Sequence, residues 1–151
     1  MKFHQLCLFF FTLVAVAHAR PKVKEFDITY TIVNKAVAPY FTNVFSGSLS
    51  VTEGDRPKLI DIMNDIAAVN SAFSFTAIKE AAHVLFITVM NGQHQQRAQD
   101  LYWLVLREED GGRCYLPKGV TSYEPVSGES ITWELMQWDI SIPTCDGGSH
   151  N

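Results

Sequence analysis

The sequence predicts an α+β fold, with small antiparallel or mixed β-sheets packed against one amphipathic α-helix, in a single domain that follows a signal peptide. Only one segment, residues 57–70, has the apolar periodicity of a helix. Six other segments have alternating or continuous apolar residues that are typical of strands. No alternation of strands with helices occurs, which argues for a sheet that one helix covers on one side.

The N-terminus has the pattern of a secretory signal peptide. Lys2 provides the positive start, residues 6–17 form an apolar stretch, and Ala17-His18-Ala19 has the small-x-small cleavage pattern. We therefore expect cleavage after Ala19, with residues 20–151 as the mature domain. An apolar stretch of about twelve residues is shorter than the roughly twenty that span a bilayer. We expect a secreted, extracellular protein without a membrane span.

The net charge of the mature chain limits the kinds of partner that we expect. Lys2 leaves with the signal, so eleven Lys and Arg stand against 16 Asp and Glu, a net charge of −5. This negative net charge argues against nucleic acid and anionic membranes as partners, because both favour clustered positive charge.

Two cysteines remain in the mature chain, Cys114 and Cys145, in a compartment that keeps disulfides oxidised. One bridge between them is the simplest interpretation, and two free thiols or pairing between molecules is the alternative.

The helix is expected to begin at Pro57, which suits a first turn, and to end near Asn70. Its apolar residues recur at i, i+3, i+4, i+7 and i+8, so that one stripe faces a core. The residues of this stripe are Leu59, Ile62, Met63, Ile66 and Ala67.

Strands are expected on both sides of this helix. Apolar and polar residues alternate in Phe26–Ile32 and Ile131–Met136, and Leu101–Leu106 is apolar throughout, as in a central strand buried on both faces. A hairpin turn is expected at Asp110-Gly111-Gly112 and a loop over Gln93–Asp100. The remaining expected strands are Val44–Val51, Phe73–Thr76 and Val84–Met90.

Motifs for catalysis or metal binding do not occur in the sequence. It has no G-x-S-x-G, no H-E-x-x-H, no Walker loop and no C-x-x-C. His83, His94 and His150 share no ligand spacing. The acidic run Glu108–Asp110 is interpreted as a solvated loop, because a Ca²⁺ site needs more oxygen ligands at defined offsets. We expect neither an enzyme nor a metal site.

Six short motifs occur in the order and with the gaps of a known domain. They cover about residues 44–138 and are Lys58–Met63, Phe73–Thr76, Ile87–Gly92, Tyr102–Leu104, Lys118–Tyr123 and Gly128–Trp133. Together they resemble the C-terminal β-domain of the transcobalamin, intrinsic factor and haptocorrin family. In that family the domain closes over cobalamin that an α-helical barrel holds. The resemblance implies a free-standing β-domain with cobalamin (vitamin B12) as its ligand.

The resemblance also implies which residues contact the corrin. They are Thr88, Val89, Met90, Asn91 and Gly92 at one turn, and Trp103, Leu104 and Val105 on one strand. Gly119, Val120 and Tyr123 also match the family pattern, and they are interpreted as structural.

Two departures from the family affect the implied binding. Leu104 replaces a family glutamine, which removes a hydrogen bond to a corrin amide. The family's α-barrel, with its cobalt-coordinating histidine, is missing from this sequence. Because one half of an enclosing site leaves much of a large ligand exposed, binding by this chain alone is expected to be weak.

Two functions follow from these features. The first is a secreted cobalamin-binding or transport-type protein that offers an aromatic and backbone platform to the corrin. A separate α-barrel chain or a cell-surface receptor is then an expected partner. The second is a secreted module that keeps the fold without binding cobalamin and binds a protein or a glycan instead.

Overall fold

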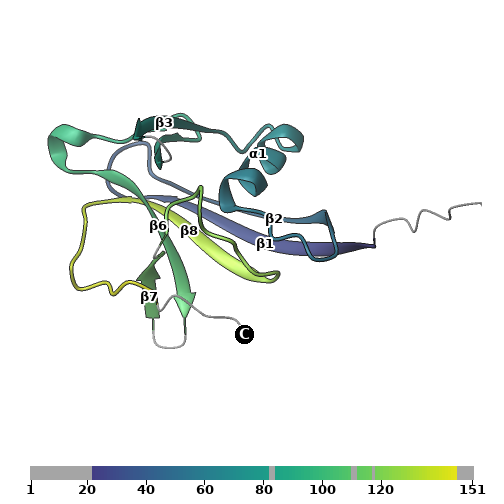
Figure 1. Cartoon of the computed structure of the whole chain (residues 1–151). Helices are drawn as coiled ribbons and strands as arrows, with labels where there is room; N and C mark the ends of the chain where they lie inside the picture. The colour runs from purple at the N-terminus through teal and green to yellow at the C-terminus, as the bar shows by residue number, and fades with distance from the viewer. Residues whose placement is uncertain (1–21, 82–83, 110–111, 117, 146–151) are drawn as a thin grey trace, which may run out of the picture.

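Two β-sheets and one α-helix make up the described part of the chain (Figure 1). The computed structural model describes residues 22–81, 84–109, 112–116 and 118–145. This architecture confirms the predicted α+β class. The elements in chain order are β1 (Val23–Asn34), β2 (Phe41–Thr52), α1 (Leu59–Val69), β3 (Phe75–Ala81), β4 (Val84–Met90), β5 (Gln93–His94), the 3-10 helix η1 (Arg97–Gln99), β6 (Tyr102–Glu109), β7 (Gly112–Tyr115) and β8 (Glu129–Met136).

The larger sheet has five strands in the order β2-β1-β8-β6-β7. β1 runs parallel to β8, and the other neighbouring strands are antiparallel, so the sheet is mixed. β1 lies inside the sheet, between β2 and β8. Phe26, Ile28, Tyr30 and Ile32 are buried, as the alternation in the sequence predicts, and Val33 and Asn34 at the end of the strand are buried as well.

The smaller, antiparallel sheet has the strand order β3-β4-β5. It meets the larger sheet at Phe73, which precedes β3 and is buried. The ring centroid of Phe73 lies 5.4 Å from that of Phe45 in β2 and 5.9 Å from that of Tyr30 in β1. Figure 1 shows the smaller sheet and α1 on the same face of the larger sheet. The core lies between this layer and the five-stranded sheet.

The apolar stripe of α1 is buried as predicted. Leu59, Ile62 and Met63 have no exposed surface, and Ile66 is nearly buried. The start of the helix differs from the prediction, because Lys58 is the N-cap and Pro57 precedes the helix. Asp61 stabilises this start by accepting a hydrogen bond from the Lys58 backbone N–H at 3.4 Å.

A turn far along the chain completes the first turn of α1. The N–H of Leu59 donates to the carbonyl oxygen of Tyr123 at 2.9 Å, and the N–H of Ile60 donates to that of Val120 at 3.1 Å. The first N–H groups of a helix have no partner within it, so these carbonyls satisfy donors that would otherwise need water. Val120 and Tyr123 thereby join the helix to the segment that leads into β8.

β5, η1 and β7 are additions to the predicted elements. Gln93–Asp100 was expected to be a loop, but it forms β5 by pairing with the end of β4 and then one turn of 3-10 helix. β7 pairs with β6 from Glu109↔Gly112 onwards, so the two strands form a hairpin. The predicted turn residues 110–111 of this hairpin lie outside the described residues.

β6 lies inside its sheet, between β8 and the edge strand β7, but it is not buried on both faces along its whole length. Trp103 is buried on the core face and Leu106 on the opposite face. Tyr102 and Leu104 are only half-buried, because strand alternation turns them away from the main core. The apolar residues of this segment therefore predicted correctly that it is a strand, but they did not predict that part of one face is only half-buried.

The predicted disulfide joins Cys114 of β7 to Cys145, 31 residues further along the chain. In the chain-entropy model a loop of this length stabilises the fold by roughly 3–4 kcal/mol. Among the described residues, no helix is long and apolar enough to cross a membrane.

Candidate ligand-binding site

The predicted contact turn is a tight hairpin between β4 and β5. Asn91 and Gly92 both have positive φ, 47° and 79°, and the flanking residues Met90 and Gln93 are paired. Asparagine followed by glycine is the preferred sequence for such a two-residue turn. Asn91 also fixes the turn to the segment before β3, because its Oδ1 accepts a hydrogen bond from the Ser74 N–H at 2.9 Å.

The other predicted residues of this turn differ in exposure. Met90 is fully buried in the core, whereas Thr88 and Val89 are half-buried and Gly92 is exposed. The hydroxyl of Thr88 donates to the carbonyl of Thr76 at 3.3 Å. In the conformation described here, Gly92 is therefore the most accessible of the five residues to a ligand.

Trp103 is buried, with 5% of its surface exposed. Its indole Nε1 donates to the carbonyl oxygen of Gln93 at 2.9 Å, which ties β6 to the Asn91-Gly92 hairpin. Leu104 and Val105 follow on opposite faces of the strand, so Trp103 and Val105 share the core face and Leu104 does not. The structure thus brings the two predicted segments together, although Trp103 serves as their core contact and does not present its ring face to solvent.

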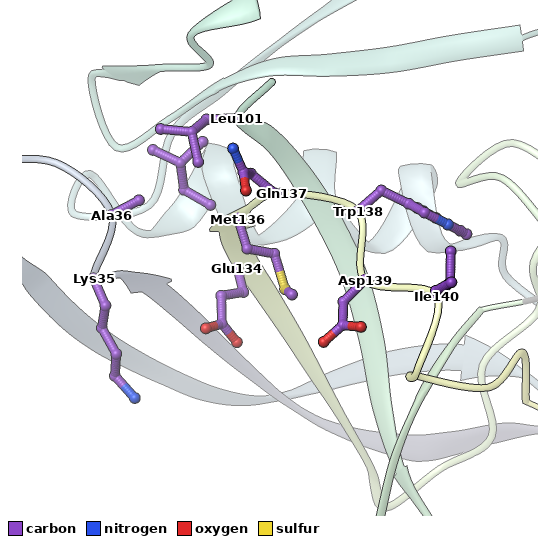
Figure 2. Close-up of a pocket in the computed structure, with 10 residues that line it drawn as sticks. Lys35, Ala36, Leu101, Glu134, Met136, Gln137, Trp138, Asp139 and Ile140 are labelled. Carbon is purple, nitrogen blue, oxygen red and sulfur yellow. The ribbon is translucent and has the colours of Figure 1, made fainter. Parts of the chain in front are cut away.

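A groove of about 660 Å³ opens at the ends of β1 and β8 and the start of β6 (Figure 2). Its wall includes Leu135, which pairs with Trp103 across the sheet, so the groove adjoins the predicted contact strand. The lining residues are Lys35, Ala36, Leu101, Glu134, Leu135, Met136, Gln137, Trp138, Asp139 and Ile140.

The aromatic wall of the groove comes from the segment after β8. Trp138 is 58% exposed and its ring is stacked on that of Tyr115 in β7, with centroids 4.1 Å apart and an interplanar angle of 10°. Such an offset stack fixes the indole orientation while leaving much of the ring in contact with solvent. Ile140, which is drawn beside Trp138 in Figure 2, is almost fully exposed. An exposed, oriented indole next to apolar side chains can stack against a flat ligand.

The disulfide and backbone hydrogen bonds hold this segment in place. Cys145 is bridged to Cys114, its N–H donates to the Tyr115 carbonyl at 2.7 Å, and the Tyr115 N–H donates to the Pro143 carbonyl at 2.8 Å. At the other end, Gln137 Nε2 donates to the carbonyl of Gln99 at 3.1 Å. The groove wall is therefore attached to β7 and to the segment before β6 (Figure 1).

Polar groups in the groove carry charges of both signs. Glu134 is paired with Arg113 of β7, and Lys35 lies at the end of β1. Hydrogen bonds from the Ser141 hydroxyl and backbone N–H hold the pKa of Asp139 below its usual range. These side chains can donate to and accept from the polar substituents of a ligand.

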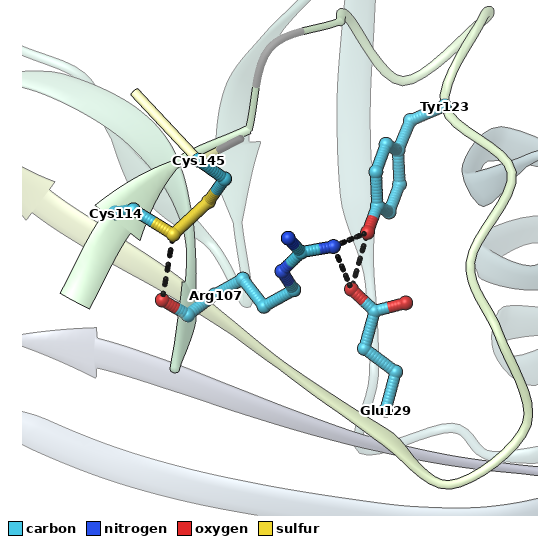
Figure 3. Close-up of a disulfide and its surroundings, with 5 residues drawn as sticks. All are labelled: Arg107, Cys114, Tyr123, Glu129 and Cys145. Carbon is cyan, nitrogen blue, oxygen red and sulfur yellow. Dashed lines mark hydrogen bonds and ion pairs between the residues drawn. A yellow bond between two sulfur atoms is a disulfide. The ribbon is translucent and has the colours of Figure 1, made fainter. Parts of the chain in front are cut away.

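A buried polar cluster lies near the disulfide and contains Arg107 of β6, Glu129 of β8 and Tyr123 of the segment before β8 (Figure 3). The Tyr123 hydroxyl donates to Glu129, Arg107 Nη1 donates to the Tyr123 oxygen at 2.9 Å, and Arg107 Nη1 lies 3.6 Å from Glu129 Oε1. Glu129 Oε2 also accepts the Val126 N–H at 2.9 Å. The cluster fixes the connection between β7 and β8, and we assign it a structural role.

This cluster predicts how stability changes at high pH. Burial, the hydrogen bond to Glu129 and the charge of Glu129 raise the pKa of Tyr123 from 10.0 to about 12, against the opposing effect of Arg107. Because the pKa is raised in the folded state, protonated Tyr123 stabilises the fold fully below pH 10, and this stabilisation is lost as the pH rises towards 12. We expect urea unfolding to show a smaller loss of stability over this range in Tyr123→Phe than in wild type.

The matched control for this experiment is Tyr40→Phe, because Tyr40 is exposed. Burial and Glu129 also raise the pKa of Tyr30, so part of the loss should persist in Tyr123→Phe. An equal loss of stability in Tyr123→Phe and wild type as the pH rises would show that Tyr123 does not cause the pH dependence.

Metal-binding chemistry receives no support from the described residues, among which no three His, Cys, Asp or Glu side chains cluster in a way that could hold an ion. His94 is exposed in β5. His83 and His150 lie outside the described residues, as do residues 1–21 with the predicted cleavage site.

Sequence reasoning missed the groove residues after β8. Trp138 follows the alternating residues of the last strand and precedes Asp139, so the sequence indicates that Trp138 lies outside this strand. The stacking partner of Trp138 could not be identified in this way, because Tyr115 is 23 positions away and the strand that carries it, which follows the predicted hairpin turn, was not predicted.

Comparisons with known proteins bear on the fold. No protein-family model matches the chain, and no curated protein matches it. The structure is similar to that of haptocorrin in complex with Cbi, with a TM-score of 0.57 and 16% sequence identity over 77% of this chain and 26% of the haptocorrin chain. A protein from Ruminococcus gnavus, named as a candidate metal-binding protein, has a TM-score of 0.47 and 14% identity over 76% of this chain and all of its own. The chain therefore shares its fold with a part of haptocorrin about one quarter of that protein's length, in agreement with the family resemblance of its motifs.

Proposed function

We propose that this chain is an extracellular binding protein for corrinoids of the cobalamin class, without catalytic activity of its own. The observation that carries the proposal is the groove lined by Trp138, which adjoins β6, one of the two segments that the family resemblance assigns to corrin contact. The shared fold with part of haptocorrin, a protein crystallised in complex with Cbi, supports the choice of ligand.

The chemistry of the groove suits such a ligand. A corrin has a broad apolar ring edged by amides, which an indole face and flanking polar side chains can contact. Trp138 and Leu101 offer apolar surface, and Lys35, Gln137 and Asp139 offer donors and acceptors. On this proposal Trp138 has the platform role that the sequence suggested for Trp103.

The open shape of the groove sets the expected affinity. Ligand sites that bind tightly bury most of the ligand surface, and a groove on one face of a small domain leaves the opposite face of a corrin in water. We therefore propose weak binding by the chain alone and tighter binding when a second, helical chain covers the exposed face. Docking a separate chain adds an association cost of several kcal/mol.

Calorimetric titration with cobalamin tests this proposal. Trp138→Ala is expected to weaken binding about tenfold or more, because truncation removes the stacking surface. Val69→Ala is the matched control, since Val69 is also an exposed apolar residue but ends α1. Equal affinities of wild type and Trp138→Ala would remove the groove from the proposal.

One observation favours a module that binds a protein or a glycan. Trp103 and Met90, two of the residues assigned to corrin contact, are buried. If wild type takes up no cobalamin while Trp138 and Ile140 remain exposed, this end of the molecule is better explained as a surface for another macromolecule.

A further inference from the structure

β2 is a sheet edge without the features that usually protect one. It forms one side of the five-stranded sheet and pairs with β1 over all twelve residues, from Val23↔Thr52 to Asn34↔Phe41, without a bulge. It contains no charged residue and no proline. Among the described residues, the backbone hydrogen bond that reaches β2 from outside the strands is the one from the Asp55 N–H to the Thr52 carbonyl. A long edge of this kind readily accepts another strand.

The other sheet edges in the described residues differ in these respects. β7 has four residues, includes Arg113, and is bridged at Tyr115 to Thr144 beside the disulfide. β3 includes Lys79 and Glu80 and has two register shifts against β4. β5 has only two residues. Short length, charge, bulges and covering segments are the usual means of blocking an edge, and β2 has none of them.

We propose that β2 pairs antiparallel with β2 of a second copy of this chain, which joins two five-stranded sheets into one. In an acidic protein, an uncharged strand is where two copies approach with the least repulsion. A two-fold axis perpendicular to the sheet relates the two copies, and such an axis makes the two β2 strands antiparallel.

The two faces of β2 restrict the register. Phe41, Phe45 and Leu49 are half-buried on the core face, whereas the serines on the other face are exposed. Side chains alternate between the two faces of a strand with a period of two. With a two-fold axis perpendicular to the sheet, the core face of one copy therefore continues into the core face of the other only if one residue of β2 lies directly opposite the same residue of the second copy. Near the middle of the strand, the axis then passes Ser46, Gly47 or Ser48. These registers pair Ser46 with Ser46, Ser46 with Ser48, or Ser48 with Ser48.

The double variant Ser46→Lys/Ser48→Lys tests all three registers, because each of them places two lysines directly opposite one another. Sedimentation velocity over a concentration series should show dimers for wild type and a dissociation constant raised at least about tenfold for this variant. Asp27, which accepts a hydrogen bond from Ser48, offers the new lysines an intramolecular partner that supports folding. Ser130→Lys is the matched control, since Ser130 is an exposed strand residue inside the sheet, and it should dimerise as wild type does.

Cross-linking gives a second readout that does not depend on the lysine variant folding. Under mild oxidation, the double variant Ser46→Cys/Ser48→Cys should form a disulfide-linked dimer, because each of the three registers places two of its cysteines directly opposite one another, and Ser130→Cys should not. Monomeric wild type at every concentration overturns the proposal and leaves an extended segment of another protein as the occupant of the edge. Dimers that persist in a folded double-lysine variant, or equal cross-linking at Ser130, also overturn it.

Discussion

Replacing Glu129 by alanine is expected to lower the free energy of unfolding by about 3–5 kcal/mol, the cost of breaking a buried ion pair by removing one partner. The Glu129 carboxylate is almost fully buried, accepts hydrogen bonds from the Tyr123 hydroxyl and the Val126 N–H, and is paired with Arg107. Its loss removes the acceptor for two donors in a part of the molecule that excludes water. Chemical denaturation monitored by tryptophan fluorescence measures the change.

Glu124→Ala is the control for this experiment. Glu124 forms an ion pair with Arg56 at 4.0 Å, but both side chains are exposed to solvent, by 44% and 75%, and exposed pairs contribute about 0–1 kcal/mol. The two variants remove the same functional group only five positions apart. Equal small losses in both variants would show that the buried cluster does not fix the segment before β8.

Ile62→Ala is expected to cost about 2–5 kcal/mol, because Ile62 has no exposed surface and alanine leaves a cavity between α1 and the sheets. Val69→Ala, at the exposed end of the same helix, should change stability by less than about 0.5 kcal/mol. Thermal and denaturant unfolding of the three proteins test this difference. Similar stabilities of Ile62→Ala and wild type would place the core contact of α1 elsewhere on the helix.

Local patterns in the sequence predicted most of the fold. The period-two alternation of β1 and β8 and the helical stripe of α1 depend on neighbours in sequence, and they identified the buried residues of these elements. β5 and β7 escaped prediction because two or four residues are too few to establish a period. The predicted hairpin turn at Asp110-Gly111-Gly112 indicated a partner for β6 but not the extent of β7, and the pairing of β5 with β4 had no such signal.

The candidate site was less predictable than the fold for a similar reason. The resemblance pointed to Trp103, but an apolar strand such as Leu101–Leu106 does not reveal which of its faces meets the core. The structure turns Trp103 inwards and leaves Trp138 exposed on its stack with Tyr115. The disulfide and the Tyr115 backbone hydrogen bonds hold the last segment against β7, where this stack lies, and these contacts join residues far apart in the sequence.

The central claim, that this chain binds a corrinoid, is tested most directly by the visible absorption spectrum of cobalamin titrated with the purified wild-type protein. We expect a saturable spectral change at cobalamin and protein concentrations up to about 1 mM, the range expected for weak binding by one half of an enclosing site. We expect a smaller change in Trp138→Ala. An unchanged spectrum over this range, with equilibrium dialysis showing no retained cobalamin, would contradict the claim.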